Sequence, residues 1–150
     1  MAIMDKRTEF GVAFDIAESA GTLLFTNQID LGAANIDIGN GQPVYLCIHI
    51  IEAVSTGSSP TINFRLRSDD SAAIHATTSS AHFETGAIAA ALLTAGSKWV
   101  YALPLNNAVP YERYLGLQAV VATATTTTGT ATAFLSLDPE GWKAYADATN

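Results

Sequence analysis

The sequence predicts an all-β protein: a single-domain antiparallel β-sandwich or jelly roll with extended terminal arms. Apolar residues recur at every second position through most of the chain, turn-forming segments separate these runs at regular spacing, and hardly any segment shows helical periodicity. A length of 150 residues suits one domain. We predict an N-terminal arm or edge segment over 1–22, the jelly-roll domain over 23–138 and a C-terminal tail over 139–150.

The clearest predicted strand spans residues 61–67. Its apolar side chains occupy alternate positions, at Ile62, Phe64 and Leu66, and polar side chains lie between them. This is the pattern of an antiparallel strand with one buried face, so it places Phe64 in the core. The same alternation predicts strands over 23–31, 99–105, 113–121 and 130–137. Leu115 then belongs to the buried face of the fourth of these runs.

Residues 44–51 differ from the other runs because they are apolar at nearly every position. Leu46 and Ile48 would face one side of the sheet, and Cys47 and Ile51 would face the other. Such a pattern is typical of a central strand that is covered on both sides. It also predicts that Cys47 is a small buried residue rather than a reactive thiol.

Turn signals divide the strands from one another. Ser55–Pro60 and 125–130 are rich in Ser, Thr, Gly and Pro, and each is predicted to close a hairpin between the strands that flank it. Further breaks fall at 39–43 and 106–110. The alanine-rich stretch 82–93 is equally compatible with a short helix and with extended chain.

The two ends of the chain lie beyond these strands. Apolar side chains at Phe10, Val12, Phe14 and Ile16 alternate with smaller or polar residues, which is compatible with an extended arm, an edge strand or one turn of helix. Pro139 is predicted to end the last strand, and Trp142 and Tyr145 follow it among small and polar residues.

Composition and charge exclude several classes of function. The net charge is −7 with only seven basic residues, which argues against a nucleic-acid partner. No apolar run approaches the roughly 20 residues that cross a bilayer, and no signal-peptide core follows the charged start, so we expect no membrane partner. Almost half of the residues are hydrophobic and only 14% are charged, which excludes intrinsic disorder and favours a surface partly covered in an assembly.

No catalytic constellation emerges from the sequence. The three histidines do not pair at metal-ligand spacing, and the single cysteine cannot form an intrachain disulfide. Asp69 and Asp70 lack the alternating oxygen ligands of a calcium loop and are predicted to lie in a solvated turn. No nucleophile elbow or Walker-type phosphate loop is present. We therefore predict a protein that is not an enzyme, with no catalytic, cofactor-binding or metal-binding residues.

Several segments together carry a family resemblance. They are Asp5–Phe10, Asn27–Gly32, Asp37–Tyr45, Phe64–Asp70, Glu112–Leu117 and Ala133–Asp138. In this order and spacing they resemble the jelly-roll cement, or decoration, proteins of tailed phages, of the kind found on a short-tailed Bordetella phage. The resemblance covers residues 5–138, and the tail runs past the end that the family leads us to expect.

The resemblance implies a structural virion protein without enzymatic activity. Its partners would be the major capsid protein and further copies of itself, as a dimer or trimer. It would be made in the host bacterial cytoplasm and would lie on the outer capsid surface, where it braces the shell. Phe10, Phe14, Trp142 and Tyr145 are the candidate capsid or subunit contacts, since they lie outside the core strands and aromatic side chains are favoured at interfaces.

An alternative with the same architecture is a virion module that binds a carbohydrate or a receptor. Such modules use exposed aromatic rings, and Trp99, Tyr101, Trp142 and Tyr145 are the candidates. Trp99 and Tyr101 share a strand face with Leu103, so the sequence favours the core for both. A hydrolase is disfavoured because no site was found.

Overall fold

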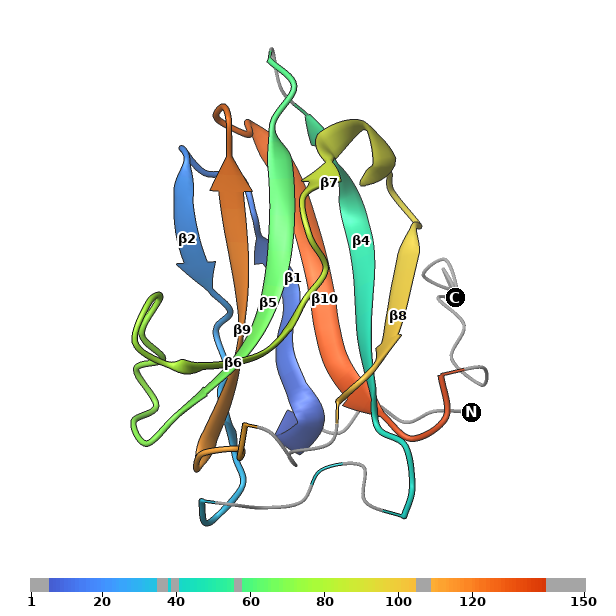
Figure 1. Cartoon of the computed structure of the whole chain (residues 1–150). Helices are drawn as coiled ribbons and strands as arrows, with labels where there is room; N and C mark the ends of the chain where they lie inside the picture. Colours follow the sequence, from blue (N-terminus) through green and yellow to red (C-terminus); the bar gives the residue numbers. More distant parts are fainter. Residues whose placement is uncertain (1–5, 35–37, 39–40, 56–57, 105–108, 140–150) are drawn as a thin grey trace.

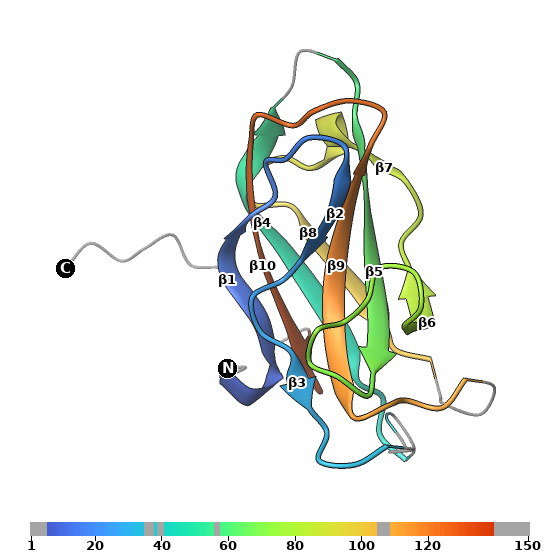
Figure 2. The ribbon, with the colours of Figure 1, turned by 90° about the vertical axis from the view of Figure 1, so that its left-hand side faces the viewer.

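The computed structural model describes residues 6–34, 38, 41–55, 58–104 and 109–139 of the chain (Figure 1). Within them, ten β-strands and two short 3-10 helices form two layers, which Figure 2 shows from the side. The all-β sandwich predicted from the sequence is confirmed. The ambiguous stretch 82–93 contains extended chain and a single 3-10 turn.

Four strands form sheet A and four others form the body of sheet B. Sheet A has the order β1 (Glu9–Asp15), β10 (Thr128–Ser136), β4 (Tyr45–Ser55), β8 (Lys98–Ala102). Sheet B has the order β2 (Gly21–Leu24), β9 (Tyr114–Ala122), β5 (Thr61–Asp69), β6 (Ser80–Glu84). Two short strands extend sheet B, β3 (Ile29–Asp30) beside β9 and β7 (Ile88–Ala89) beside β5, and the 3-10 helices are η1 (Lys6–Thr8) and η2 (Ala90–Leu92). All pairings are antiparallel, and the chain crosses repeatedly between the sheets, as in a jelly roll.

The two predicted hairpins are wrong. Strands β4 and β5 flank Ser55–Pro60 but belong to different sheets, and the same is true of β9 and β10 around 125–130. Each connection instead crosses from one layer to the other. Local turn chemistry indicates where the chain reverses, whereas strand partners depend on which apolar faces pack together.

The core lies between the sheets and contains the predicted inward positions. Phe64 and Leu115 are completely buried, as expected from the alternation. Sheet A contributes Leu46, Ile48 and Ile50 from β4 to the same cluster. Burying side chains of this size stabilises a fold by roughly 1.5–3 kcal/mol each, so the core between the two sheets is the main source of stability.

The N-terminal segment is an edge strand rather than an extended arm. Strand β1 pairs with β10, with a bulge between Gly11 and Phe14. The side chain of Phe10 is fully buried, and the ring of Phe14 stacks on Phe25 with centroids 4.4 Å apart. Of the two alternatives predicted for 1–22, an arm or an edge segment, the structure has the edge segment, because the alternating apolar residues of Glu9–Asp15 complete the sandwich. The C-terminal tail beyond Pro139 lies outside the described residues.

Candidate docking surface

The outward side chains of sheet A form a surface that we call face A. Its members alternate with the inward residues Leu46, Ile48 and Ile50 of β4. Strand register aligns them in three cross-strand rows. These rows are Ala102–Tyr45–Ser136, Val100–Cys47–Phe134 and Lys98–His49–Thr132, and Ile51 follows on β4.

The middle row of face A is apolar throughout. Val100 is 43% exposed, and Ile51 beyond the rows is 45% exposed. Leu137, just after β10, also leaves more than half of its side chain accessible. Cys47 and Phe134, the other two residues of this row, are nearly inaccessible to solvent. Burial raises the pKa of the Cys47 thiol to about 11. An apolar strip of this kind is typical of a surface that a partner covers.

The edge of sheet A beside β1 extends this apolar character. Val12 lies in the bulge and is 56% exposed. Next to it, Ala13 has a positive φ of 45°, and its N–H donates to the Thr132 hydroxyl at 3.0 Å. This bond ties the bulge to face A and leaves Val12 at the surface.

The outward side of sheet B, which we call face B, has the opposite chemistry. The Glu84 carboxylate lies 3.3 Å from Arg65 Nε and 3.9 Å from Arg67 Nη2. The Asn63 amide also donates to Glu84, at 3.2 Å. Glu84 is thus the shared partner of β5 side chains on this face, while the Nε atoms of Arg65 and Arg67 make no hydrogen bond within the described part of the chain.

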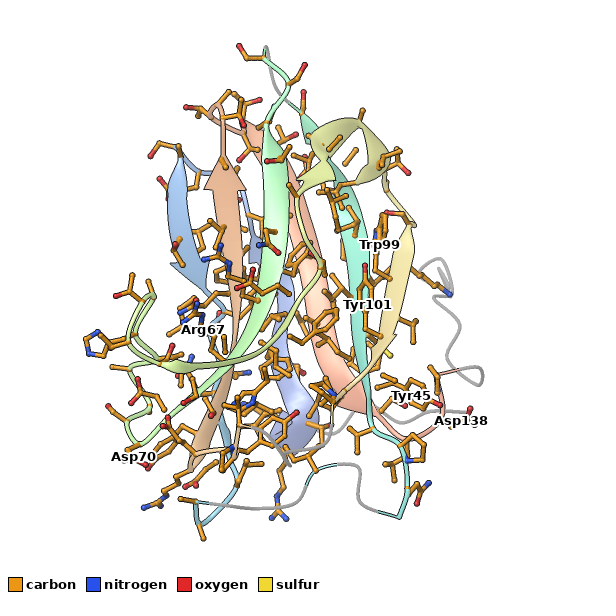
Figure 3. All side chains as sticks on the ribbon, viewed as in Figure 1. Tyr45, Arg67, Asp70, Trp99, Tyr101 and Asp138 are labelled. Atoms are coloured by element: carbon orange, nitrogen blue, oxygen red, sulfur yellow. The ribbon has the colours of Figure 1, made fainter. Side chains whose placement is uncertain are left out.

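A loop over residues 70–79 covers one end of face B. Its Ile74 is buried over Gly116, where an added Cβ would lie 2.7 Å from the Ile74 side chain. The Gln118 amide donates to the His75 carbonyl at 3.3 Å, and Arg67 Nη1 donates to the Ser79 carbonyl at 3.0 Å. Figure 3 labels Arg67 and Asp70 at this side of the molecule. This end of face B is thus covered by a loop of the chain itself.

Asp69, the last residue of β5, and Asp70 lead into this loop, and Asp69 has a structural role. Its carboxylate accepts the N–H of Ser71 at 3.1 Å and that of His75 at 3.3 Å. These bonds are those of an Asx-type turn, in agreement with the predicted turn. Within the described part of the chain, no group of three or more His, Cys, Asp or Glu side chains could hold a metal ion.

A serine–histidine contact lies at the end of sheet B. Ser68 Oγ accepts the N–H of Glu112 at 2.9 Å and is hydrogen-bonded to His82 Nε2 at 2.6 Å. The His82 ring stacks on Tyr111 at 4.0 Å, and burial lowers the pKa of His82 to about 4. Ser68 is completely buried, which prevents it from reaching a substrate. This contact therefore closes the end of the sandwich.

A shallow hollow of about 450 Å³ lies near the other end of the molecule. The described residues that line it are small or aliphatic, namely Val54, Ser55, Ser58, Ser59, Pro60 and Ala89–Ala91. None of them has an aromatic ring on which a sugar could stack.

None of the helices in the described ranges is long and apolar enough to cross a membrane.

The structure places the four predicted contact residues differently from one another. Phe10 is a correction, because its fully buried side chain has no surface to offer a capsid or a second subunit. Phe14 packs against the core, and Trp142 and Tyr145 lie outside the described residues.

Sequence reasoning missed face A as a surface. The signal was the strand 44–51, whose second apolar side includes Cys47 and Ile51. By itself this strand could not reveal that Val100 and Phe134 continue the same row.

The comparison with protein families agrees with this fold. The profile of a family described as Bbp16 matches residues 16–135, which is most of the chain. The chain belongs to the Bbp16 family. That name suggests a Bordetella phage protein, so the resemblance is confirmed at the level of a phage protein. The match runs from just after β1 to near the end of β10, and leaves residues 136–150 outside it. No curated protein sequence matches the chain.

Proposed function

We propose that this Bbp16-family protein is a capsid cement, or decoration, protein. In this proposal it is a non-enzymatic virion component that binds the major capsid protein on the outer capsid surface and braces neighbouring shell subunits. The observation that carries the proposal is the partly exposed apolar row of face A, with Ile51 and Leu137 beside it, on the jelly roll of a Bbp16-family chain.

The energetics of face A suit a repeated contact. Each exposed aliphatic side chain there, such as Val100 or Ile51, contributes a small hydrophobic gain when a partner covers it, at roughly 25 cal/mol per Å². One such patch binds weakly, but neighbouring copies that also contact one another bind a lattice more strongly through avidity. The proposal accordingly includes a homo-oligomer, either a dimer or a trimer, which light scattering of the purified protein measures.

A sedimentation experiment with capsids that lack this protein tests the proposal. Wild-type protein is expected to co-sediment with these capsids. The substitution Val100→Glu puts a charge in the apolar row and is expected to weaken binding by about tenfold or more, equivalent to about 1.4 kcal/mol. The matched control Val120→Glu changes the same residue type on face B and is expected to bind like wild type.

Two results would contradict the proposal. Absence of wild-type protein from the capsid pellet rejects the cement function. Equal binding by Val100→Glu and wild type keeps the function but rejects face A as its docking surface.

The alternative, a carbohydrate- or receptor-binding module, has less support from the described residues. Trp99 packs against the core, and the ring of Tyr101 lies 4.8 Å from that of Phe83 in the other sheet. Both aromatic rings therefore close the sandwich along β8, where Figure 3 labels them. Specific binding on a glycan array, without binding to capsids, would favour this alternative.

A further inference from the structure

Strand β8 forms one edge of sheet A, beside β4 (Figure 1). It pairs with β4 on one side, and no strand in the described part of the chain pairs with its other side. The Leu103 N–H donates to the Val44 carbonyl at 2.8 Å, so Leu103 and every second residue before it bond toward β4. Val100 and Ala102, at the intervening positions, therefore direct their N–H and C=O groups away from the sheet.

The other strand edges of the described ranges are short or irregular. Strand β1 has register shifts and a positive φ at Ala13, and β6 has a register shift in its pairing with β5. Strands β2, β3 and β7 have only four, two and two residues. Bulges and short lengths keep an edge strand from pairing with another chain. Strand β8 has five residues and no register shift against β4, so it is the described edge best suited to accept a further strand.

The side chains of β8 are complementary to a second copy of the same strand. Val100, at the centre of the strand, is 43% exposed. Trp99 and Tyr101, on either side of it, point toward the other sheet but are only partly buried. A two-fold axis at Val100 would place Val100 across from its own copy, and Trp99 across from Tyr101. Aliphatic and aromatic cross-strand pairs of this kind stabilise neighbouring strands.

The charge of Lys98 fits the same register. Lys98 is exposed at the start of β8, and the small uncharged Ala102 is exposed at its end. With the axis at Val100, Lys98 of each copy lies beside Ala102 of the other, and the two lysines are about 13 Å apart along the strands. An axis at Trp99 would halve that separation. Since like charges that face each other across two strands are destabilising, the register centred on Val100 is favoured.

We propose that two copies of the protein pair edge to edge through antiparallel β8 strands, with the two-fold axis at Val100. Their two A sheets then form one continuous sheet. The inference rests on the homo-oligomer of the proposed function and specifies its interface. It also aligns the apolar rows of the two copies, from Phe134 and Cys47 of one copy through both Val100 residues to the other. Because a two-fold interface closes on itself, the assembly is a dimer and not a trimer.

The equilibrium between monomer and dimer tests this proposal. Sedimentation equilibrium of the purified full-length protein, over a range of concentrations and without capsids, gives the mass and the dissociation constant. Wild type is expected to reach twice the mass of one chain. Val100→Pro removes the outward N–H but no hydrogen bond to β4, which is the position where an edge strand tolerates proline. It is expected to raise the dissociation constant by about tenfold or more, because both central hydrogen bonds of the interface are lost.

Thr22→Pro on β2 is the matched control. The Phe25 N–H donates to the Leu117 carbonyl at 2.9 Å, so by the same alternation the N–H of Thr22 faces away from β9. This variant also removes an outward N–H from an edge strand, but on the other sheet, and it is expected to dimerise like wild type. Circular dichroism checks that both proline variants are folded.

Two substitutions at Ala102 report on the register without changing the backbone. Ala102→Glu puts a carboxylate beside Lys98 of the second copy and is expected to lower the dissociation constant by about twofold to tenfold. Ala102→Lys puts a like charge there and is expected to raise it by a similar factor. High salt should reduce the difference between the two variants. This pair decides the matter if Val100→Pro does not fold.

Four outcomes would overturn the proposal. They are a monomer at every concentration, a trimeric mass, a dimer that is unaffected in folded Val100→Pro, and equal dissociation constants for the two Ala102 variants. Failure here is distinct from failure of the cement function, since none of these measurements involves capsids. A dimer that does not co-sediment with capsids rejects the cement function alone, whereas a monomer that binds them rejects only the β8 interface.

Discussion

On face B, Glu84 contacts Arg65, Arg67 and Asn63, whereas the middle row of face A consists of Val100, Cys47 and Phe134. Both faces are the outer sides of sheets that share one core. On face B, Glu84 pairs with side chains of a neighbouring strand, and Arg67 and Gln118 donate to backbone carbonyls of the loop 70–79. On face A the apolar side chains of the middle row gain stability only when something apolar covers them.

The two faces show two ways in which the outer side chains of a β-sandwich can be stabilised. A face whose polar groups are already paired has little to gain from a partner, because binding would first remove water from those groups. Covering apolar side chains carries no such desolvation cost, and the binding free energy becomes more favourable as more apolar area is covered. The contrast is the reason for placing the docking surface on sheet A.

The largest expected effect comes from comparing a core phenylalanine with the phenylalanine of face A. Phe64→Ala removes a fully buried ring and is expected to lower the free energy of unfolding by about 3–5 kcal/mol. Phe134→Ala is expected to cost roughly half as much, because it lies outside the main core cluster. Urea denaturation measures both. Equal losses would show that face A is packed as tightly as the core, and an unchanged Phe64→Ala protein would reverse the assigned strand faces.

A smaller effect is expected where the loop covers face B. Gly116→Ala places a Cβ 2.7 Å from the Ile74 side chain, so the loop 70–79 must shift. Overpacking of this kind costs about 1–3 kcal/mol. Thermal unfolding and the rate of proteolysis in this loop measure the change. Gly21→Ala on β2 is the control, because its nearest neighbour would lie at an ordinary 3.6 Å. Similar losses in both variants would mean that the loop does not hold face B.

The pH dependence of stability reports on His82 at the end of sheet B. Its pKa is about 4 in the folded protein, below the ordinary value of 6.5, because burial disfavours the charged ring. The unfolded chain therefore binds the proton first, so stability is fully present above pH 6.5 and declines as the pH falls toward 4. Denaturation in a pH series should show this decline in wild type and a weaker one in His82→Gln. His75→Gln in the exposed loop is the control, and an identical profile for His82→Gln would contradict this role.

The smallest effect is expected at an exposed ion pair of sheet B. Arg113 Nε and Nη2 each donate to Asp30 at 3.0 Å, and both side chains are nearly half exposed. Exposed ion pairs contribute little because water and salt screen them, so Arg113→Ala should lower the free energy of unfolding only slightly. Denaturation in low and high salt measures the difference, which should shrink as salt screens the pair. A large loss that is insensitive to salt would indicate that Arg113 acts through its stacking on Tyr114 instead.

Residue alternation predicted the long strands and their inner faces, but the predicted strand 23–31 is two short strands, β2 and β3, and β6 and β7 were not predicted. In 61–67, for example, the positions of Ile62, Phe64 and Leu66 follow from the extended backbone alone, and each of them is buried. Alternation could not distinguish an arm from an edge strand over 1–22, since both are extended. Nor could turn composition at Ser55–Pro60 reveal whether the flanking strands pair or separate into two sheets.

The sequence by itself determined that this protein is an all-β sandwich with a core on one side of each strand, because those features depend on local backbone geometry and side-chain polarity. Only the tertiary structure decided which outer face carries an apolar row. Val100, Cys47 and Phe134 lie far apart in the chain, and they form one row because β8, β4 and β10 are neighbours in sheet A. Strand order is a long-range property, set by the packing of whole sheets, and no segment of the sequence contains it.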